Sequence, residues 1–127
     1  MRRLKVISCF LFAEKPNFKS KLQFETLGEI GKELEIPCDV EGSPSPKVTW
    51  YRDTEPLSSI PAVRYNIADN GSLVINYMRR EDSGMFQCSA SNQAGYTTAY
   101  TWLRVKSKWI YCADYTATHY NQIYTLL

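Results

Sequence analysis

The sequence predicts an all-β domain, a sandwich of antiparallel sheets. Three short runs alternate apolar and polar residues, and Cys38, Trp50 and Cys88 each lie in one of them. Alternation of this kind is typical of strands with one buried face, so all three residues are expected to point inward. Two cysteines and a tryptophan on the inner faces of neighbouring strands predict a core in which these side chains meet.

The spacing of these residues also carries a resemblance. Trp50 follows Cys38 by twelve residues, and the second cysteine closes the run Asp82-Ser83-Gly84-Met85-Phe86-Gln87-Cys88. This pattern resembles the immunoglobulin I-set domains, and most of all those of sidekick-type cell adhesion proteins. The resemblance covers about residues 16–105, within a predicted domain at residues 16–106. It implies an immunoglobulin-like Greek-key sandwich whose two antiparallel sheets are pinned by a Cys38–Cys88 disulfide against Trp50.

Composition limits the classes of function. The chain has 127 residues, room for one domain, and a net charge of +2 that is too small to predict binding to nucleic acid or to an acidic membrane. No run approaches the roughly 18 apolar residues of a membrane helix, so a membrane enters only through a parent protein. The four cysteines form no C-x-x-C, and His119 is the single histidine, so no metal site is expected.

Catalytic signatures are also missing from the sequence. A nucleophile–histidine arrangement would have to use His119, which lies in a poorly patterned tail. The pair Glu81-Asp82 lies at a predicted corner without sign of a cleft, and no glycine-rich phosphate loop is present. We therefore expect no enzyme, no cofactor and no small-molecule substrate.

The implied disulfide indicates in which cellular compartment the domain folds. A bond between Cys38 and Cys88 closes a loop of about fifty residues, which the chain-entropy model equates with roughly 4 kcal/mol of stability. Such a bond needs an oxidising setting, so the sequence favours an extracellular or cell-surface location.

Residues 1–15 allow two interpretations. A basic start followed by an apolar run of about eight residues has the outline of a weak signal peptide, but Leu11 stands where a small residue is preferred before a cut. The alternative is an irregular or non-native segment before the first strand. Cys9 leaves with a signal peptide or stays as a spare thiol.

The first half of the domain divides into strands and turns. Residues 16–27 are a predicted edge strand, with Phe18, Leu22 and Phe24 on one side. Residues 28–31 form a turn. The strand at 33–40 carries Cys38, and residues 41–46 then break the chain with two prolines before the Trp50 strand at 47–52. The side chains predicted to fill the core with Trp50 are Leu34, Ile36, Leu73, Ile75, Phe86 and Leu103.

The run Asn70-Gly71-Ser72 has two competing interpretations. It separates predicted strands at 62–67 and 73–77, and Asn-Gly is a strong hairpin signal because both central residues accept positive φ. It is also a glycosylation sequon at Asn70.

The family pattern implies two features of the corner at residues 79–84. It pairs Asp82 with a basic residue at the start of the preceding strand, here Arg64. The corner tyrosine of the family is Phe86 in this chain, which fills the core but has no hydroxyl. We therefore expect a somewhat weaker corner and an unchanged fold.

The last strand of the family, residues 96–105 here, predicts a candidate interface. Ala99, Thr101, Leu103 and Val105 match its inward residues, so the alternate side chains face outward. Aromatic residues and arginine are enriched at binding hot spots, and an exposed aromatic patch indicates a partner. The alternative is that a terminal segment covers this face. The candidate interface is Tyr51, Thr49, Gln87, Ser89, Tyr100, Trp102 and Arg104.

Residues 107–127 do not continue the family pattern. This tyrosine- and threonine-rich segment has no countable periodicity and no pattern of a second domain, and its apolar character predicts a docked or adhesive tail rather than a solvated linker. It fits a truncated or alternatively ended product, or a junction. Pairing of Cys112 with Cys9 stays open.

Three functions remain. The favoured one is an extracellular protein-binding module for cell–cell adhesion or receptor-type recognition, with a homophilic or related immunoglobulin-superfamily partner and a neuronal setting implied by the resemblance. The second is an intracellular, muscle-type structural domain, which predicts free thiols. The third is a secreted decoy of a longer adhesion protein. Fold alone does not choose among them.

Overall fold

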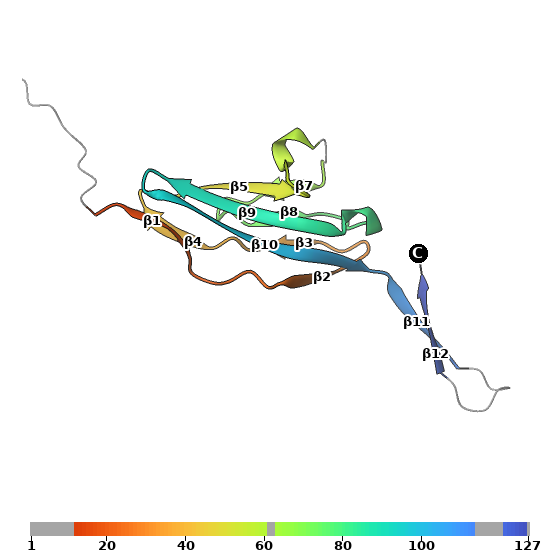
Figure 1. The fold of residues 1–127 in the computed structure, drawn as a ribbon. Helices are drawn as coiled ribbons and strands as arrows, with labels where there is room; N and C mark the ends of the chain where they lie inside the picture. The colour runs from red at the N-terminus through yellow and green to blue at the C-terminus, as the bar shows by residue number, and fades with distance from the viewer. Residues whose placement is uncertain (1–11, 61–62, 114–120, 127) are drawn as a thin grey trace, which may run out of the picture.

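The structure is a computed structural model that describes residues 12–60, 63–113 and 121–126. Its elements are strands and two short 3-10 turns (Figure 1). The strands are β1 (Glu14–Phe18), β2 (Glu25–Glu29), β3 (Leu34–Ile36), β4 (Val40–Ser43), β5 (Lys47–Arg52), β6 (Glu55–Pro56), β7 (Tyr65–Ile67), β8 (Leu73–Ile75), β9 (Gly84–Asn92), β10 (Gly95–Lys106), β11 (Lys108–Ala113) and β12 (Asn121–Leu126). The turns are η1 (Leu57–Ser59) and η2 (Arg80–Asp82). No helix in the described part of the chain has the length and apolar composition needed to cross a membrane.

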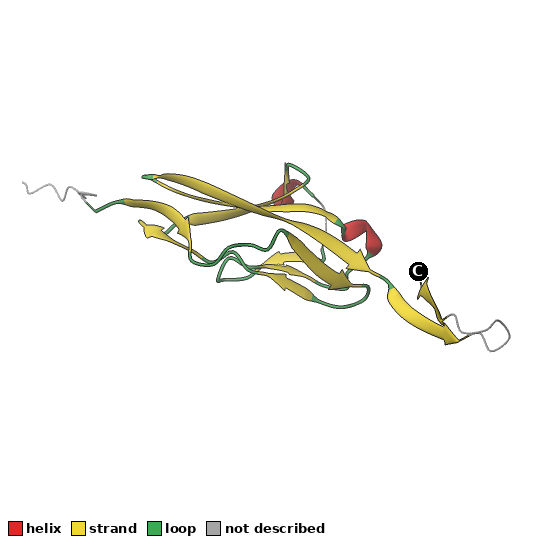
Figure 2. Ribbon diagram, turned by 60° about the horizontal axis from the view of Figure 1, so that its bottom comes forward, coloured by secondary structure: helices red, strands yellow, loops and turns green. Residues whose placement is uncertain are grey.

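Two layers of strands pack face to face, as the turned view shows (Figure 2). One layer is a five-stranded sheet in the order β2-β10-β9-β5-β6, and the other contains β3-β8-β7, with the pair β1-β4 at one end of the sandwich. The predicted immunoglobulin-like sandwich is therefore confirmed. The two sheets are not wholly antiparallel, because β2 runs parallel to β10, with Glu25 opposite Trp102.

The predicted first strand, residues 16–27, is wrong in its extent. It divides into β1, which pairs with β4, and β2, which joins the five-stranded sheet. The chain crosses between the layers over residues 19–24, which breaks the period of two. Phe18 and Leu22 pack against the core, whereas Phe24 is 71% exposed.

The predicted strand at residues 33–40 is also interrupted. β3 pairs with β8 and β4 pairs with β1, while Cys38 lies in the extended segment between them. Pro37 explains the break, since it has no N–H to continue the ladder of β3. Cys38 nevertheless lies in the core, because Lys19 N–H donates to the carbonyl of Asp39 at 2.9 Å and holds this segment against the N-terminal strand.

The core lies between the layers, around Trp50. Cys38 and Cys88 form a disulfide with their Cα atoms 6.4 Å apart, and both cysteines are at most 1% exposed. The indole N–H of Trp50 donates to the carbonyl of Gly71 at 2.8 Å, which satisfies its one polar group. Leu34 is half-buried and packs against this core. The remaining predicted core residues are all buried: Ile36, Leu73, Ile75, Phe86 and Leu103.

The turn between β7 and β8 differs from the predicted tight hairpin. The strands do pair, but five residues join them, and the N–H of Ala68 donates to the carbonyl of Ser72 at 2.8 Å. Gly71 has φ +88°, whereas Asn70 does not adopt a positive φ. The two-residue form with two positive φ values occurs instead at Asp53 and Thr54, between β5 and β6.

The segment after β10 forms a hairpin that was not expected. β11 and β12 pair antiparallel, with Lys108 opposite Leu126, and make a sheet of their own. In Figure 1 this hairpin extends beyond the end of the sandwich. Threonine, tyrosine and isoleucine favour such strands. Cys9 lies outside the described residues, so its pairing with Cys112 stays a prediction that the structure does not test.

Candidate functional site

The outer face of the five-stranded sheet is the surface that points away from the core. We define it by the side chains of β10, β9, β5 and β2 that alternate with buried ones. Tyr100 lies opposite Gln87, and Gln87 lies opposite Tyr51 on the next strand. Thr49 and Ser89 form the adjoining cross-strand pair. The structure thus brings the seven predicted interface residues onto one face.

The exposed part of the outer face is aromatic. Tyr100 is 51% and Trp102 46% exposed, and Arg104 follows on the same side of β10. Thr49, Tyr51, Gln87 and Ser89, on the neighbouring strands β5 and β9, are half-buried. Alternation along β10 produces this separation, because Thr101 and Leu103 point inward and are at most 3% exposed.

A groove lies beside Trp102, where β2 and β10 meet the corner that precedes β9. Its volume is about 560 Å³, and its lining includes Phe24, Ser83 and Gly84. Across the parallel pair, the Arg104 Nε atom lies 3.1 Å from a carboxylate oxygen of Glu25. Both side chains are largely exposed, so this ion pair orients the arginine more than it stabilises the fold.

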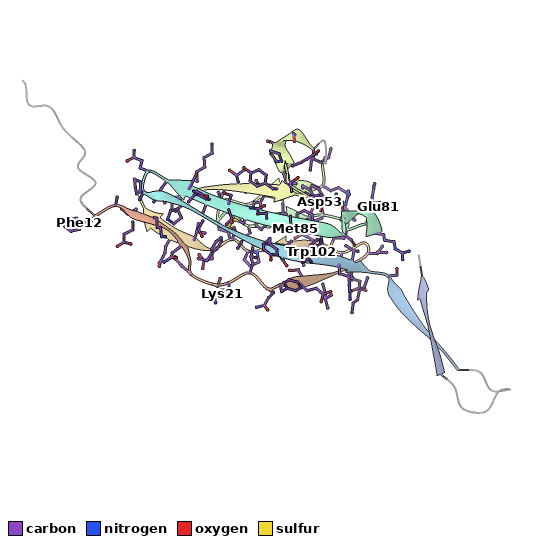
Figure 3. The ribbon with its side chains drawn as sticks, in the orientation of Figure 1. Phe12, Lys21, Asp53, Glu81, Met85 and Trp102 are labelled. Carbon is purple, nitrogen blue, oxygen red and sulfur yellow. A yellow bond between two sulfur atoms is a disulfide. The ribbon has the colours of Figure 1, made fainter. Side chains whose placement is uncertain are left out.

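Several residues of this face were not predicted from the sequence. Met85 lies opposite Trp102, and Asp53 continues the same row, since its carboxylate accepts the Met85 N–H at 3.0 Å (Figure 3). Leu27 lies opposite Arg104 in the parallel pair and is 52% exposed, while Phe24, just before β2, lines the groove beside Trp102 and is 71% exposed. Alternation around Cys88 would have identified Met85. Phe24 and Leu27 had no such signal. Alternation counted from β1 does not continue through residues 19–24, so it does not show which side of the sheet these two side chains take.

The corner at residues 79–84 is held by a buried carboxylate. Asp82 is 1% exposed and accepts two hydrogen bonds from Arg64, at 2.6 and 2.9 Å. It also accepts the Tyr65 hydroxyl at 2.6 Å and the Arg79 backbone N–H at 2.7 Å. Burial raises the pKa of Asp82, but these hydrogen bonds from Arg64, Tyr65 and Arg79 lower it more, so the net pKa lies below the ordinary value.

Tyr65 packs beside Phe86 and brings a hydroxyl to the Asp82 carboxylate. The two rings pack edge to face with centroids 5.9 Å apart, and Arg52 donates to the Tyr65 hydroxyl at 2.7 Å. Burial, and then the hydrogen bond to Asp82, raises the pKa of Tyr65 to about 12, so the hydroxyl stays a donor across the neutral range. The Tyr65 hydroxyl bonds a carboxylate and not the backbone, so the expectation of a somewhat weaker corner stays a prediction.

We expect Tyr65→Phe to lower the free energy of unfolding by about 1–2 kcal/mol, because it removes a hydrogen bond to a buried charged group. Urea unfolding monitored by tryptophan fluorescence measures this loss. Tyr77→Phe is the control, since Tyr77 is 74% exposed and should change stability little. Equal stability of the two variants would contradict the role given to the Tyr65 hydroxyl.

The described residues hold no assembly that suggests chemistry. No group of three or more histidine, cysteine, aspartate or glutamate side chains is placed to bind a metal ion within them. Glu81 and Asp82 lie at the corner, and Asp82 is fully engaged there. His119 lies outside the described part of the chain. What the site offers is an exposed aromatic surface with a groove at one end.

Comparisons with known proteins agree with this fold. Residues 16–105 match the model of the immunoglobulin I-set domain. Protein sidekick of Drosophila melanogaster is 42% identical over 95 residues, which is 74% of this chain and 4% of that protein. Protein sidekick-1 of Mus musculus is 40% identical over 92 residues, 72% of this chain and 4% of that protein. The chain therefore spans about 4% of the length of these relatives.

Solved structures give the same result in three dimensions. The structure of sidekick-1 immunoglobulin domains 1–4 matches with a TM-score of 0.73 and 39% identity, over 75% of this chain and 25% of that one. A chimeric titin Z1Z2 matches with a TM-score of 0.67 and 28% identity, over 76% of this chain and 98% of that one. The resemblance that the cysteine and tryptophan spacing predicted is confirmed, and the chain belongs to the immunoglobulin I-set family.

Proposed function

We propose that this chain is an extracellular protein-binding module for cell–cell adhesion or receptor-type recognition, and that it binds through the outer face. The observation that carries the proposal is the row of exposed aromatic side chains, Tyr100 and Trp102, beside the groove lined by Phe24. An exposed apolar patch rimmed by polar groups is typical of a protein contact. Its arginine and aromatic residues are those enriched at hot spots.

The partner we propose is a second copy of this chain or a related immunoglobulin-superfamily protein. The relatives described above are sidekick proteins, and a structure of the insect protein hemolin, described with implications for homophilic adhesion, matches with a TM-score of 0.65 and 30% identity. The buried Cys38–Cys88 disulfide fits an extracellular setting. Like the sidekick resemblance, it supports the proposed location.

Trp102→Ala and Tyr51→Ala are expected to weaken association by about 2 kcal/mol each, roughly thirtyfold in Kd, if they are hot-spot residues. Sedimentation equilibrium of the domain against itself measures this change, and thermal unfolding checks that each variant is folded. Ile67→Ala is the matched control, because Ile67 is 51% exposed on the other sheet.

Three results would contradict this assignment. Association unchanged by Trp102→Ala removes the outer face as the contact. Loss of folding in either variant shows that the side chain is part of the core. A wild-type domain that stays monomeric at all accessible concentrations excludes a second copy of this chain as the partner. Capture of related immunoglobulin-superfamily ectodomains then tests the other proposed partner.

A structural spacer is the second candidate, because titin domains share this fold, including the fragment I67–I69 at a TM-score of 0.64 and 29% identity. Intact mass and a thiol count of the protein made in eukaryotic cells separate the two functions. A secreted chain with Cys38 and Cys88 oxidised supports the binding module. Retention in the cell with both thiols free supports the spacer.

A further inference from the structure

We propose that Asn70 accepts an N-linked glycan, and that the sugar is transferred before the turn around it closes. This inference rests on the extracellular setting of the proposed function. Asn70, Gly71 and Ser72 form an acceptor sequon, and the structure places Asn70 on the exposed turn between β7 and β8. A surface turn of a secreted domain is where such a modification is found.

The conformation of Asn70 in the folded domain is compatible with a glycan. Its side-chain oxygen Oδ1 accepts the backbone N–H of Ser72 at 3.0 Å, which makes a local side-chain turn. An N-linked sugar is attached to the other amide atom, Nδ2, and leaves Oδ1 as an acceptor. The glycan and the turn hydrogen bond can therefore coexist, with the sugar in solvent.

Ser72 sets the order of events. The sequon needs its hydroxyl to be reached by the transferase, but in the folded domain Ser72 is only 3% exposed. The turn is also fastened to the core, since the carbonyl of Gly71 accepts the Trp50 indole N–H at 2.8 Å. Once Trp50 packs against the Cys38–Cys88 disulfide, the hydroxyl is out of reach. Transfer therefore competes with folding and with disulfide formation.

The reaction uses a sugar donor of defined class, a lipid-diphosphate-linked oligosaccharide. The Asn70 Nδ2 atom attacks the anomeric carbon of the first N-acetylglucosamine and forms a carbon–nitrogen bond. The bond from that carbon to the diphosphate oxygen breaks, and the lipid diphosphate leaves with the electron pair. Nδ2 loses one proton, and no group is oxidised or reduced.

The position of Asn70 keeps a glycan away from the groove at Trp102. Asn70 lines a hollow with Ser45 and Pro46, next to the start of β5 and the tip of the β9–β10 hairpin. The groove at Trp102 lies at the other end of β9, beside the corner at Ser83. A glycan at Asn70 would cover the end of the sandwich at Ser45 and Pro46 and leave the end with the Trp102 groove open.

The test uses the full chain, secreted from eukaryotic cells behind a supplied signal peptide. Intact mass is measured before and after peptide N-glycosidase, which converts a glycosylated asparagine to aspartate. Asn70→Asp is the matched variant, because it keeps the oxygen that accepts the Ser72 N–H but cannot carry the sugar. A second culture receives a mild reducing agent during synthesis and is then allowed to oxidise.

We expect one enzyme-sensitive glycan on the wild-type chain, none at position 70 in Asn70→Asp, and a higher occupied fraction after transient reduction. A secreted, disulfide-bonded chain without a glycan under both conditions would overturn the site. An occupied fraction that does not respond to reduction would overturn the proposed order of events. Because the signal peptide is supplied, neither result bears on the outer face, which the Trp102→Ala association assay tests separately on the Asn70→Asp background.

Discussion

We expect Cys38→Ala to lower the free energy of unfolding by about 4 kcal/mol. The disulfide joins residues separated by 50 positions, and the chain-entropy model gives a cross-link of that span roughly this effect through the unfolded state. The sulfur of Cys88 is left in the core as a buried thiol, which is tolerated because free cysteine behaves as a small apolar group. The loss is a large part of the 5–15 kcal/mol that typically stabilises a domain.

Urea unfolding under non-reducing conditions measures this change, with Trp50 as the fluorescent probe in the core. Two controls separate the cross-link from the side chain. Wild-type protein treated with a reductant should unfold at nearly the same urea concentration as Cys38→Ala. Replacing Cys9 with serine should change little, because that residue takes no part in this bond. A urea concentration at half-unfolding that is unchanged in Cys38→Ala would show that the disulfide does not stabilise the domain.

The core was predictable because its signal is local. Alternation around Cys38, Trp50 and Cys88 depends only on neighbouring residues, and a strand with one buried face must show it. The same period places Leu103 and Trp102 on opposite sides of the last strand, and the family pattern indicated that Leu103 packs in the core and Trp102 is exposed. Alternation cannot show which strands are neighbours in the fold. The family pattern supplied that information for the strands of Cys38, Trp50 and Cys88.

The edges of the sheets were not predictable in the same way. The crossing at residues 19–24 moves the chain from β1 in one layer to β2 in the other, and no local pattern marks the change. Parity counted from Phe18 therefore fails at Phe24, which is exposed beside the groove. The outer face includes residues beyond the seven that were predicted. Those on its β2 side were missed because they reach this face only through the pairing of β2 with β10.

Position 86 shows what a departure from a family pattern leaves open. The missing hydroxyl of Phe86 predicts a weaker corner, but the sequence does not show which distant side chains reach the same place. In the structure Tyr65 brings a hydroxyl to this corner from β7, at 2.6 Å from a carboxylate oxygen of Asp82. This contact is a property of tertiary packing and becomes visible only when the two strands are placed together.

Asp82→Ala is the second substitution with a large expected effect, a loss of about 3 kcal/mol in the free energy of unfolding. Breaking a buried ion pair from one side costs about 3–5 kcal/mol, because the remaining charge has lost its partner. The lower end applies here, since the Arg64 side chain is 23% exposed and can still reach water. The Arg79 N–H and the Tyr65 hydroxyl lose their acceptor as well. Glu81→Ala, at the exposed neighbouring position, is the control for the corner backbone.

The same carboxylate makes part of the stability depend on pH, and the sign follows from its lowered pKa. A carboxyl whose pKa is lower in the folded state than in the unfolded state binds fewer protons when folded. Its contribution is complete above the unfolded pKa of about 4 and is lost as the pH falls through the lower folded value. Other carboxylates also titrate there, so the informative quantity is the difference between wild type and Asp82→Asn. We expect that difference in the free energy of unfolding to be constant near neutral pH and to shrink below about pH 4. Urea unfolding at each pH measures it. A difference that stays constant down to strongly acidic pH would mean that the charge of Asp82 does not stabilise this corner.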